Sequence, residues 1–271
     1  MSFDRERFVQ SQAGTVIVAL VLCLVCSAVV SVSAIGLRPR IQQNKELKVQ
    51  RNVLAAAGLW DDGMTPAQVD DTFKSIETVL VNLPRRPGEA AEAGDIATGL
   101  PAKYDSRKAA KDPKLSVEIP VDLDIAKIKR REVAAPVYLV KGEGGKVKQY
   151  IFPVYGKGLW STLYGFIALQ SDLRTVNGIT FYEHGETPGL GGEIDNPNWK
   201  SLWKGKEALT ADGQPEIDVI KGKVESGTTG AAHKIDGLSG ATLTSTGVEG
   251  LVNYWLGPDA FGPYIARQQN H

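Results

Sequence analysis

The stretch DGLSGAT at residues 236–242 leads directly into an amphipathic segment and is the most informative part of the 271-residue chain. Gly240 and Ala241 leave the backbone bare, so a large group can approach it closely. The N–H groups at the start of the following helix favour an anion, and the hydroxyl of Thr242 can be esterified by a phosphate. A turn that merely caps a helix also contains such residues. The full pattern, however, is expected by chance in only about one chain in a thousand of this length.

Hydrophobic spacing predicts the elements around this stretch. After Thr244, apolar residues at Val248, Leu251, Val252 and Trp255 line one face of a helix that ends before Pro258. Upstream, β-branched and aromatic runs predict strands over residues 137–141, 147–154, 163–170, 179–182 and 216–222. The first two strands flank the glycine-rich residues 142–145 and therefore form a hairpin. We expect an α+β domain with an antiparallel sheet and flanking helices.

The N-terminal part of the chain predicts helices and loops. Residues 41–60 carry apolar positions among charges and predict a helix that stops at Gly63. A capping box at residues 65–68 starts a second helix, whose apolar face continues through Ile76 to Leu80. Residues 83–100 form a polar loop punctuated by Pro and Gly. The domain organisation follows as a short tail (1–12), a transmembrane helix (13–37), a helical and loop-rich membrane-proximal region (38–119) and a sheet domain (120–271).

The transmembrane prediction rests on an uncharged run from Phe8 to Leu37. Twelve of the twenty residues at 16–35 are Val, Leu or Ile, and they favour insertion by about 4–7 kcal/mol. Twenty helical residues cross a hydrocarbon layer about 30 Å thick. The small residues at 32–34 also fit a signal-peptide cleavage site, but the apolar core is longer than such signals use. We expect an uncleaved anchor. Basic residues are more numerous after the span than before it, and by the positive-inside rule this would place the large domain in the cytoplasm. The rule is weaker when a long domain follows the span, so the orientation stays open.

Composition excludes several classes of function. Lys plus Arg and Asp plus Glu number 31 each, so the chain lacks the basic balance of a nucleic-acid-binding protein. The cysteines, Cys23 and Cys26, both lie in the apolar N-terminal run. They are either two small apolar residues on a membrane helix or ligands lent to a partner's metal or cluster site. The three histidines are far apart in sequence, and we expect no metal site in this chain.

Two further segments have the composition of ligand-contacting loops. In residues 184–193, Gly189 and Leu190 would let the backbone lie against a flat ligand, while Glu186 and Thr187 would bond its polar edge. The alternative for this segment is an ordinary surface turn. His184 is either a proton relay or a hydrogen-bonded structural histidine.

The second segment is residues 155–161, where glycines surround Leu159 and Trp160. Trp160 would stack on an aromatic ring system, or it is a buried core residue.

These motifs together resemble the FMN-binding domain family. The segment at 236–242 is similar to that family's flavinylation motif, whose last threonine carries FMN through a phosphoester bond. The resemblance implies covalent FMN on Thr242, with Asp236, Ser239, Gly240 and Ala241 as the recognition frame for a separate FAD-dependent flavin transferase. It also implies flavin contacts from the two further segments, which supply the remaining residues Leu159, Trp160, Glu186, Thr187, Gly189 and Leu190.

With the N-terminal anchor and the segment RNVLAAAGL at residues 51–59, the resemblance extends to C subunits of sodium-translocating NADH–quinone reductases. It implies a one-electron FMN relay without catalytic residues of its own, on the periplasmic face of the bacterial inner membrane. Other subunits would supply the NADH, quinone and sodium sites. Two alternatives stay open at this point: the equivalent subunit of an ion-translocating ferredoxin–NAD reductase, and a cofactor-free anchored assembly module.

Overall fold

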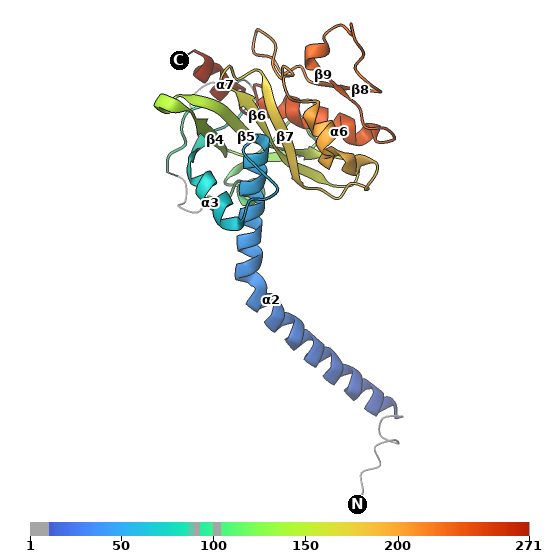
Figure 1. Ribbon diagram of the computed structural model, residues 1–271. Coiled ribbons are helices and arrows are strands. Elements are labelled where there is room, and N and C mark those ends of the chain that lie inside the picture. The colour runs from blue at the N-terminus through green and yellow to red at the C-terminus, as the bar shows by residue number, and fades with distance from the viewer. Residues whose placement is uncertain (1–10, 87, 89–92, 100–103, 271) are drawn as a thin grey trace, which may run out of the picture. The chain divides into compact units, whose positions relative to one another are not determined.

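The computed structural model describes residues 11–86, 88, 93–99 and 104–270 (Figure 1). The predicted tail up to residue 10 and parts of the predicted loop at 83–100 lie outside these residues. The chain forms two compact units, Met1–Leu47 and Lys48–His271. The helices of the described residues are α2 (Gln12–Ala56), α3 (Pro66–Lys74), α4 (Ser106–Ala109), α5 (Pro197–Ser201), α6 (Thr242–Leu256) and α7 (Gly262–Gln269). The strands are β1 (Ile76–Asn82), β2 (Ser116–Glu118), β3 (Arg130–Glu132), β4 (Ala134–Lys141), β5 (Val147–Lys157), β6 (Thr162–Gln170), β7 (Val176–Glu183), β8 (Asp218–Ile220) and β9 (Lys234–Asp236).

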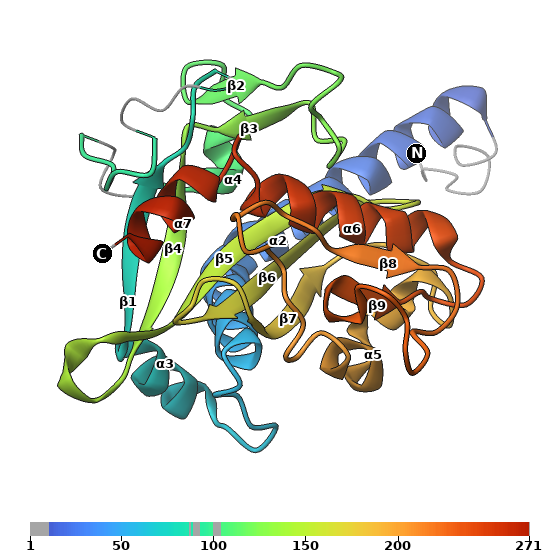
Figure 2. The ribbon, with the colours of Figure 1, turned by 90° about the horizontal axis from the view of Figure 1, so that it is seen from above.

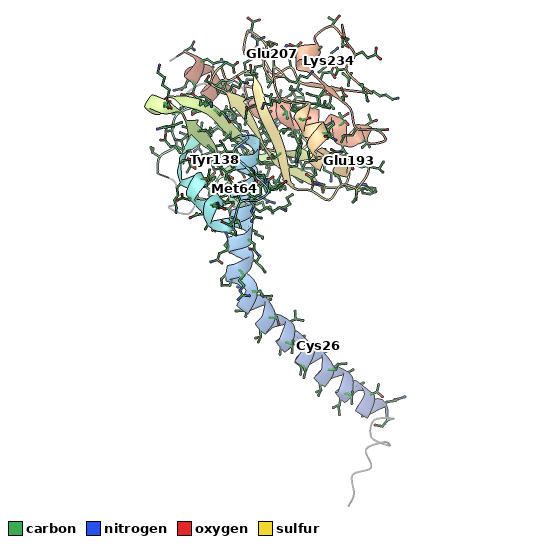
Figure 3. The ribbon with its side chains drawn as sticks, viewed as in Figure 1. Cys26, Met64, Tyr138, Glu193, Glu207 and Lys234 are labelled. Atoms are coloured by element: carbon green, nitrogen blue, oxygen red, sulfur yellow. The ribbon has the colours of Figure 1, made fainter. Side chains whose placement is uncertain are left out.

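Helix α2 contains the predicted membrane span. It is long and apolar enough to cross a membrane, and its apolar side chains lie exposed in the structure. Cys23 and Cys26 are exposed free thiols on this helix, where Figure 3 labels Cys26. The separate helix predicted for residues 41–60 is the continuation of α2, which runs through Pro39 and ends at Ala56. The predicted stop at Gly63 was therefore too late.

The unit from Lys48 onward is built on a five-stranded antiparallel sheet in the order β1-β4-β5-β6-β7. The predicted hairpin is confirmed. The hairpin of β4 and β5 turns at residues 142–146, and β6 pairs with both β5 and β7. The predicted α+β class with an antiparallel sheet is therefore confirmed.

One predicted helix was wrong in its second half. The capping box forms as expected, with the side chain of Thr65 accepting from Gln68 N–H, but α3 ends at Lys74. The residues from Ile76 onward form β1, which pairs along its whole length with β4. Cross-strand bonds to β4 outweigh the helical spacing, because a β-branched run that finds a partner strand gains a full ladder of hydrogen bonds. The expected domain boundary at residue 120 consequently falls inside one compact unit.

Helix α6 lies across one face of the sheet (Figure 2). Val248, Leu251 and Trp255 are fully buried there, and Trp255 Nε1 donates to the Tyr155 carbonyl at 2.7 Å. The last turn of α2 packs on β7, where Thr180 Oγ1 donates to the Asn52 carbonyl at 3.1 Å. In Figure 2, α6 lies in front of the strands and the end of α2 behind them, so helices cover both faces of the sheet.

The strand predicted for residues 216–222 forms only over Asp218–Ile220, as β8. It pairs in parallel with β9, and this two-stranded ribbon stands apart from the five-stranded sheet. Ile220 lies opposite Asp236, the first residue of the flavinylation-like segment. The ribbon therefore fixes the start of that segment, and α6 fixes its end.

Candidate functional site

Thr242 is the first residue of α6, and its side chain is exposed. Its hydroxyl makes no hydrogen bond to any described residue. Two neighbouring hydroxyls are occupied: Thr244 Oγ1 donates to the Glu186 carboxylate at 2.7 Å, and Ser245 Oγ accepts from Leu238 N–H at 3.0 Å. Thr244 and Ser245 are also buried, whereas Thr242 is exposed and open to a modifying group.

The turn before Thr242 has a backbone conformation that favours glycine. Gly240 has φ of +71°, which a residue with a side chain seldom adopts. A Cβ at this position would lie 3.1 Å from Leu190 Cδ2, so Gly240 and Leu190 are in close contact. Ala241 is buried and Ser239 is exposed. The turn thus brings the segment predicted to carry the cofactor against the second predicted loop.

Asp236 makes hydrogen bonds with neighbouring segments of the chain. Its Oδ1 accepts from Val224 N–H at 2.8 Å, and its carbonyl accepts from Trp199 Nε1 at 2.8 Å. These bonds tie β9 to the turn that follows β8 and to α5.

Glu186 joins the three predicted segments through its carboxylate. The side chain is only 5% exposed. It accepts the N–H groups of Leu159 at 3.2 Å, Trp160 at 3.0 Å and Ser161 at 3.1 Å, as well as the hydroxyl of Thr244. Burial alone raises the pKa of Glu186, but these hydrogen bonds outweigh it and hold the pKa below its ordinary value. The carboxylate is therefore ionised at neutral pH and positions the loops around it.

The glycine-rich loop fits closely against this carboxylate. A Cβ at Gly191 would lie 2.5 Å from Thr244 Oγ1 and 2.9 Å from Glu186 Oε2, so only glycine fits there without displacing them. Thr187, Gly189 and Leu190 lie near the tip of the loop, where Gly189 and Leu190 are exposed. The sequence pattern predicted this loop as a ligand contact, and the structure brings it beside the turn at residues 239–241.

Apolar side chains stand exposed on the loops around the start of α6. The exposed fractions are 42% for Leu159, 67% for Trp160, 44% for Leu190 and 62% for Leu243. Trp160 is thus a surface residue and not a core tryptophan. Sequence reasoning missed Leu243, which directly follows Thr242. Its exposure depends on which face of α6 packs against the sheet, and the local sequence pattern alone does not determine that face.

A cavity of about 420 Å³ opens beside Thr242. Its walls are the end of β8 with the turn after it, and the segment from Gly237 to Ser245. Small-molecule sites commonly have volumes of about 300–1,000 Å³. The cavity is large enough for the polar chain and phosphate of a flavin nucleotide. The exposed apolar side chains have the character of groups that contact an aromatic ring system. The described residues therefore fit this cofactor.

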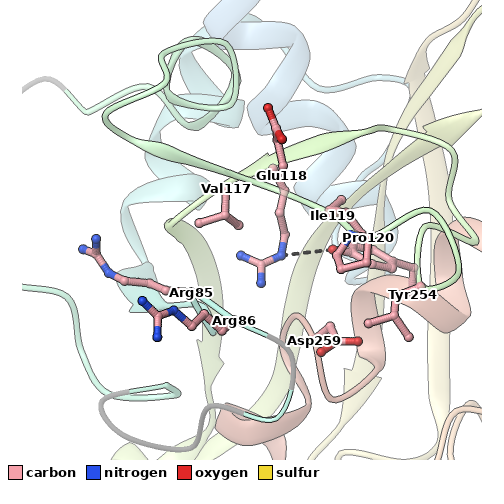
Figure 4. Close-up of a pocket in the computed structure, with 10 residues that line it drawn as sticks. Arg85, Arg86, Val117, Glu118, Ile119, Pro120, Tyr254 and Asp259 are labelled. Atoms are coloured by element: carbon pink, nitrogen blue, oxygen red, sulfur yellow. Dashed lines mark hydrogen bonds between the residues drawn. The ribbon is translucent and has the colours of Figure 1, made fainter.

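A second hollow in the domain is too small for a nucleotide. It measures about 20 Å³ and lies between the Arg85–Arg86 loop, the β2 segment and Tyr254 (Figure 4). One of its lining residues, Arg131, is 3% exposed and donates from Nε to the Tyr254 hydroxyl at 3.1 Å. This hollow has room for about one water molecule.

His184 is hydrogen-bonded at both ring nitrogens. Its Nδ1 accepts from Glu186 N–H at 3.2 Å, so the proton resides on Nε2, which donates to Asp195 at 2.9 Å. Among the described residues, no group of three or more His, Cys, Asp or Glu side chains is arranged to hold a metal ion.

Comparisons with known proteins agree with this site. A family model described as FMN-binding domain matches residues 158–257, which include Leu159, Trp160, the loop at 184–193 and Thr242. The C subunit of the Na(+)-translocating NADH-quinone reductase of Pseudomonas aeruginosa is 49% identical over 95% of this chain and 96% of its own length. The protein of the same name from Yersinia pestis is 42% identical over 98% and 97%.

Solved structures give the same result for the fold. A crystal structure of Shewanella oneidensis NqrC superposes with a TM-score of 0.72 and 36% identity, covering 83% of this chain and 97% of that one. The corresponding C subunit from Parabacteroides distasonis superposes with a TM-score of 0.62 at 26% identity, covering 84% and 96%. The alternatives of a ferredoxin–NAD reductase subunit and a cofactor-free module are thereby set aside. The chain belongs to the family of C subunits of the Na(+)-translocating NADH-quinone reductases, and it is the membrane-anchored, FMN-binding subunit of that electron-transfer complex.

Proposed function

We propose that Thr242 carries the FMN of this subunit through a phosphoester bond. The observation that carries the proposal is the state of its hydroxyl, which is exposed and unbonded to any described residue at the rim of the 420 Å³ cavity. The neighbouring hydroxyls of Thr244 and Ser245 are buried and already hydrogen-bonded. Asp236, Ser239, Gly240 and Ala241 then act as the frame that presents Thr242.

The modification requires a partner enzyme, because a threonine hydroxyl is a weak nucleophile at neutral pH. A flavin transferase would activate Thr242 Oγ, which displaces AMP from FAD. The Oγ–P bond forms, the P–O anhydride bond breaks, the AMP oxygen takes the electron pair, and the hydroxyl proton passes to the transferase's base. The exposure of Ser239, Gly240 and Thr242 supports access by such an enzyme.

The exposed apolar side chains form the proposed flavin bed, defined as Leu159, Trp160, Leu190 and Leu243. When bound, the cofactor supplies one-electron transfer, and the protein supplies its position and surroundings. Trp160 would stack on the ring and the leucines would exclude water from one side of it. Thr187 and the backbone beside Gly189 would contact the polar edge. Glu186 holds the loops that carry Leu159, Trp160 and Leu190.

Peptide mass mapping of the protein purified from its own membrane tests the attachment. The expected result is FMN, less one water, on the peptide that contains Thr242. An unmodified Thr242 peptide, or FMN on a different residue, would contradict the proposal.

We further propose that the domain from Lys48 onward lies on the periplasmic side of the bacterial inner membrane, with α2 as an uncleaved anchor. The cysteine-free sequence after Cys26 suits an oxidising compartment. The apolar, exposed surface of α2 supports its place in the bilayer.

Reporter fusions test this orientation. Fusions placed after residue 60 and at the C-terminus should be active with alkaline phosphatase, which folds only after export, and inactive with a cytoplasmic fluorescent reporter. The reverse pattern at both positions would place the domain in the cytoplasm.

A further inference from the structure

Two lysines on one wall of the 420 Å³ cavity have no counter-ion among the described residues. Lys221 and Lys223 line the cavity together with Ser239 and Thr242. Neither lysine makes an ion pair or a side-chain hydrogen bond with any residue that the structure describes. A nearby cation of the same ribbon differs in this respect, since Lys234 lies 4.0 Å from Asp218. Thr242 and the two lysines thus border one cavity, and ammonium groups there would attract an anion such as a phosphoryl group.

The turn that carries these lysines is held in place by the flavinylation-like segment itself. Asp236 accepts Val224 N–H at 2.8 Å, and Gly237 N–H donates to the Gly222 carbonyl at 2.9 Å. A Cβ at Gly237 would overlap the Ile220 carbonyl, so the two backbones are in direct contact. Asp236 does not line the cavity. Its carboxylate therefore acts on the cavity through the position of the turn at residues 221–223.

We propose that Lys221 and Lys223 bind the phosphoryl group through which the flavin is joined to Thr242, and that Asp236 is the positioning residue for both lysines. This inference rests on the proposed attachment at Thr242. The phosphoryl group has two possible sources, the diphosphate of the FAD donor during modification and the phosphodiester of the finished protein. Both are anions that lysine ammonium groups stabilise at short range. The arrangement gives the Asp of the motif a physical role that does not require contact with the flavin.

The test compares the double variant Lys221→Gln/Lys223→Gln with Lys146→Gln/Lys148→Gln. The control pair has the same spacing and charge change, and it lies exposed on the β4–β5 hairpin. Each protein is co-expressed with the flavin transferase, and the flavinylated fraction is followed by intact mass. We expect modification of Lys221→Gln/Lys223→Gln to be about tenfold slower than wild type, because charge-assisted bonds to phosphate are lost. The control pair should match wild type, and Lys221→Arg/Lys223→Arg should recover most of the rate.

A phosphorus-31 NMR spectrum of each fully modified protein distinguishes the two sources. A shifted phosphodiester signal in Lys221→Gln/Lys223→Gln identifies the finished protein as the state bound by the lysines. Slower modification with an unchanged signal identifies the donor. If both the rate and the signal equal those of wild type, the proposal is wrong, although attachment at Thr242 stands. If wild-type protein carries no flavin on Thr242, the attachment itself fails.

Asp236→Ala separates positioning from direct recognition by the transferase. The proposal expects it to slow modification as much as the loss of both lysines, with no further loss when the three substitutions are combined. Two results would overturn this role and show that Asp236 acts independently of the lysines. In the first, Asp236→Ala slows flavin attachment while the double lysine variant is modified at the wild-type rate. In the second, the losses in rate are fully additive when the three substitutions are combined.

Discussion

Thr242→Ala is expected to remove covalent FMN completely. The phosphoester needs a hydroxyl at this position. The hydroxyls of Thr244 and Ser245 are buried and hydrogen-bonded, and the other hydroxyls nearby lie at least three residues away in the chain. The measurement is the intact mass and peptide map after co-expression with the flavin transferase. Thr242→Ser keeps the hydroxyl and should retain flavin. FMN on the alanine variant would refute the assignment.

The structure provides a matched control for this substitution. Thr246 lies one turn further along α6, is also exposed, and makes no side-chain hydrogen bond with the described residues. Thr246→Ala should therefore carry FMN like wild type. Both alanine variants should keep the wild-type free energy of unfolding to within about 0.5 kcal/mol, because exposed helix positions tolerate alanine. A common loss of flavin in both variants would point to a general disturbance of the helix.

Glu186→Leu is expected to lower the free energy of unfolding by about 3–4 kcal/mol. The change leaves the N–H groups of Leu159, Trp160 and Ser161 and the hydroxyl of Thr244 without their acceptor inside the protein, and each unsatisfied group costs about 1 kcal/mol or more. Urea unfolding measures the loss. Glu186→Gln keeps one acceptor oxygen and should have an intermediate effect. Glu143→Leu, on the exposed hairpin, should change stability by less than about 0.5 kcal/mol.

The pKa of Glu186 gives this effect a pH dependence. Because the pKa in the folded protein lies below the ordinary value of 4.5, the carboxylate contributes stability above that pH and loses it as pH falls through the folded pKa. The stability difference between wild type and Glu186→Gln should be largest at neutral pH and should narrow below about pH 4.5. An equal difference at neutral and at strongly acidic pH would show that the ionised carboxylate is not what holds the loops.

Local sequence was sufficient wherever the physical cause is local. The uncharged apolar run predicted the membrane helix, because bilayer insertion depends on composition and length. The alternating strands on either side of residues 142–145 predicted a hairpin, because a short turn forces its flanking strands to pair. Gly240 and Ala241 before a helix indicated a bare turn beside Thr242. Each of these predictions depends on residues within a few positions of one another.

Tertiary structure decided what depends on partners distant in sequence. Ile76 to Leu80 have helical spacing, yet they form β1 because β4, far along the chain, provides a ladder of hydrogen bonds. Glu186 was predicted to bond a ligand, and the fold shows that its carboxylate also accepts hydrogen bonds from two other segments and holds the loops together. The exposure of Leu243 follows from the rotation of α6 on the sheet. The sequence by itself thus determined which residues have the chemistry for flavin attachment, and only the fold determined which of them face the cavity and which hold the others in place, because burial and hydrogen-bond partners are set by long-range packing.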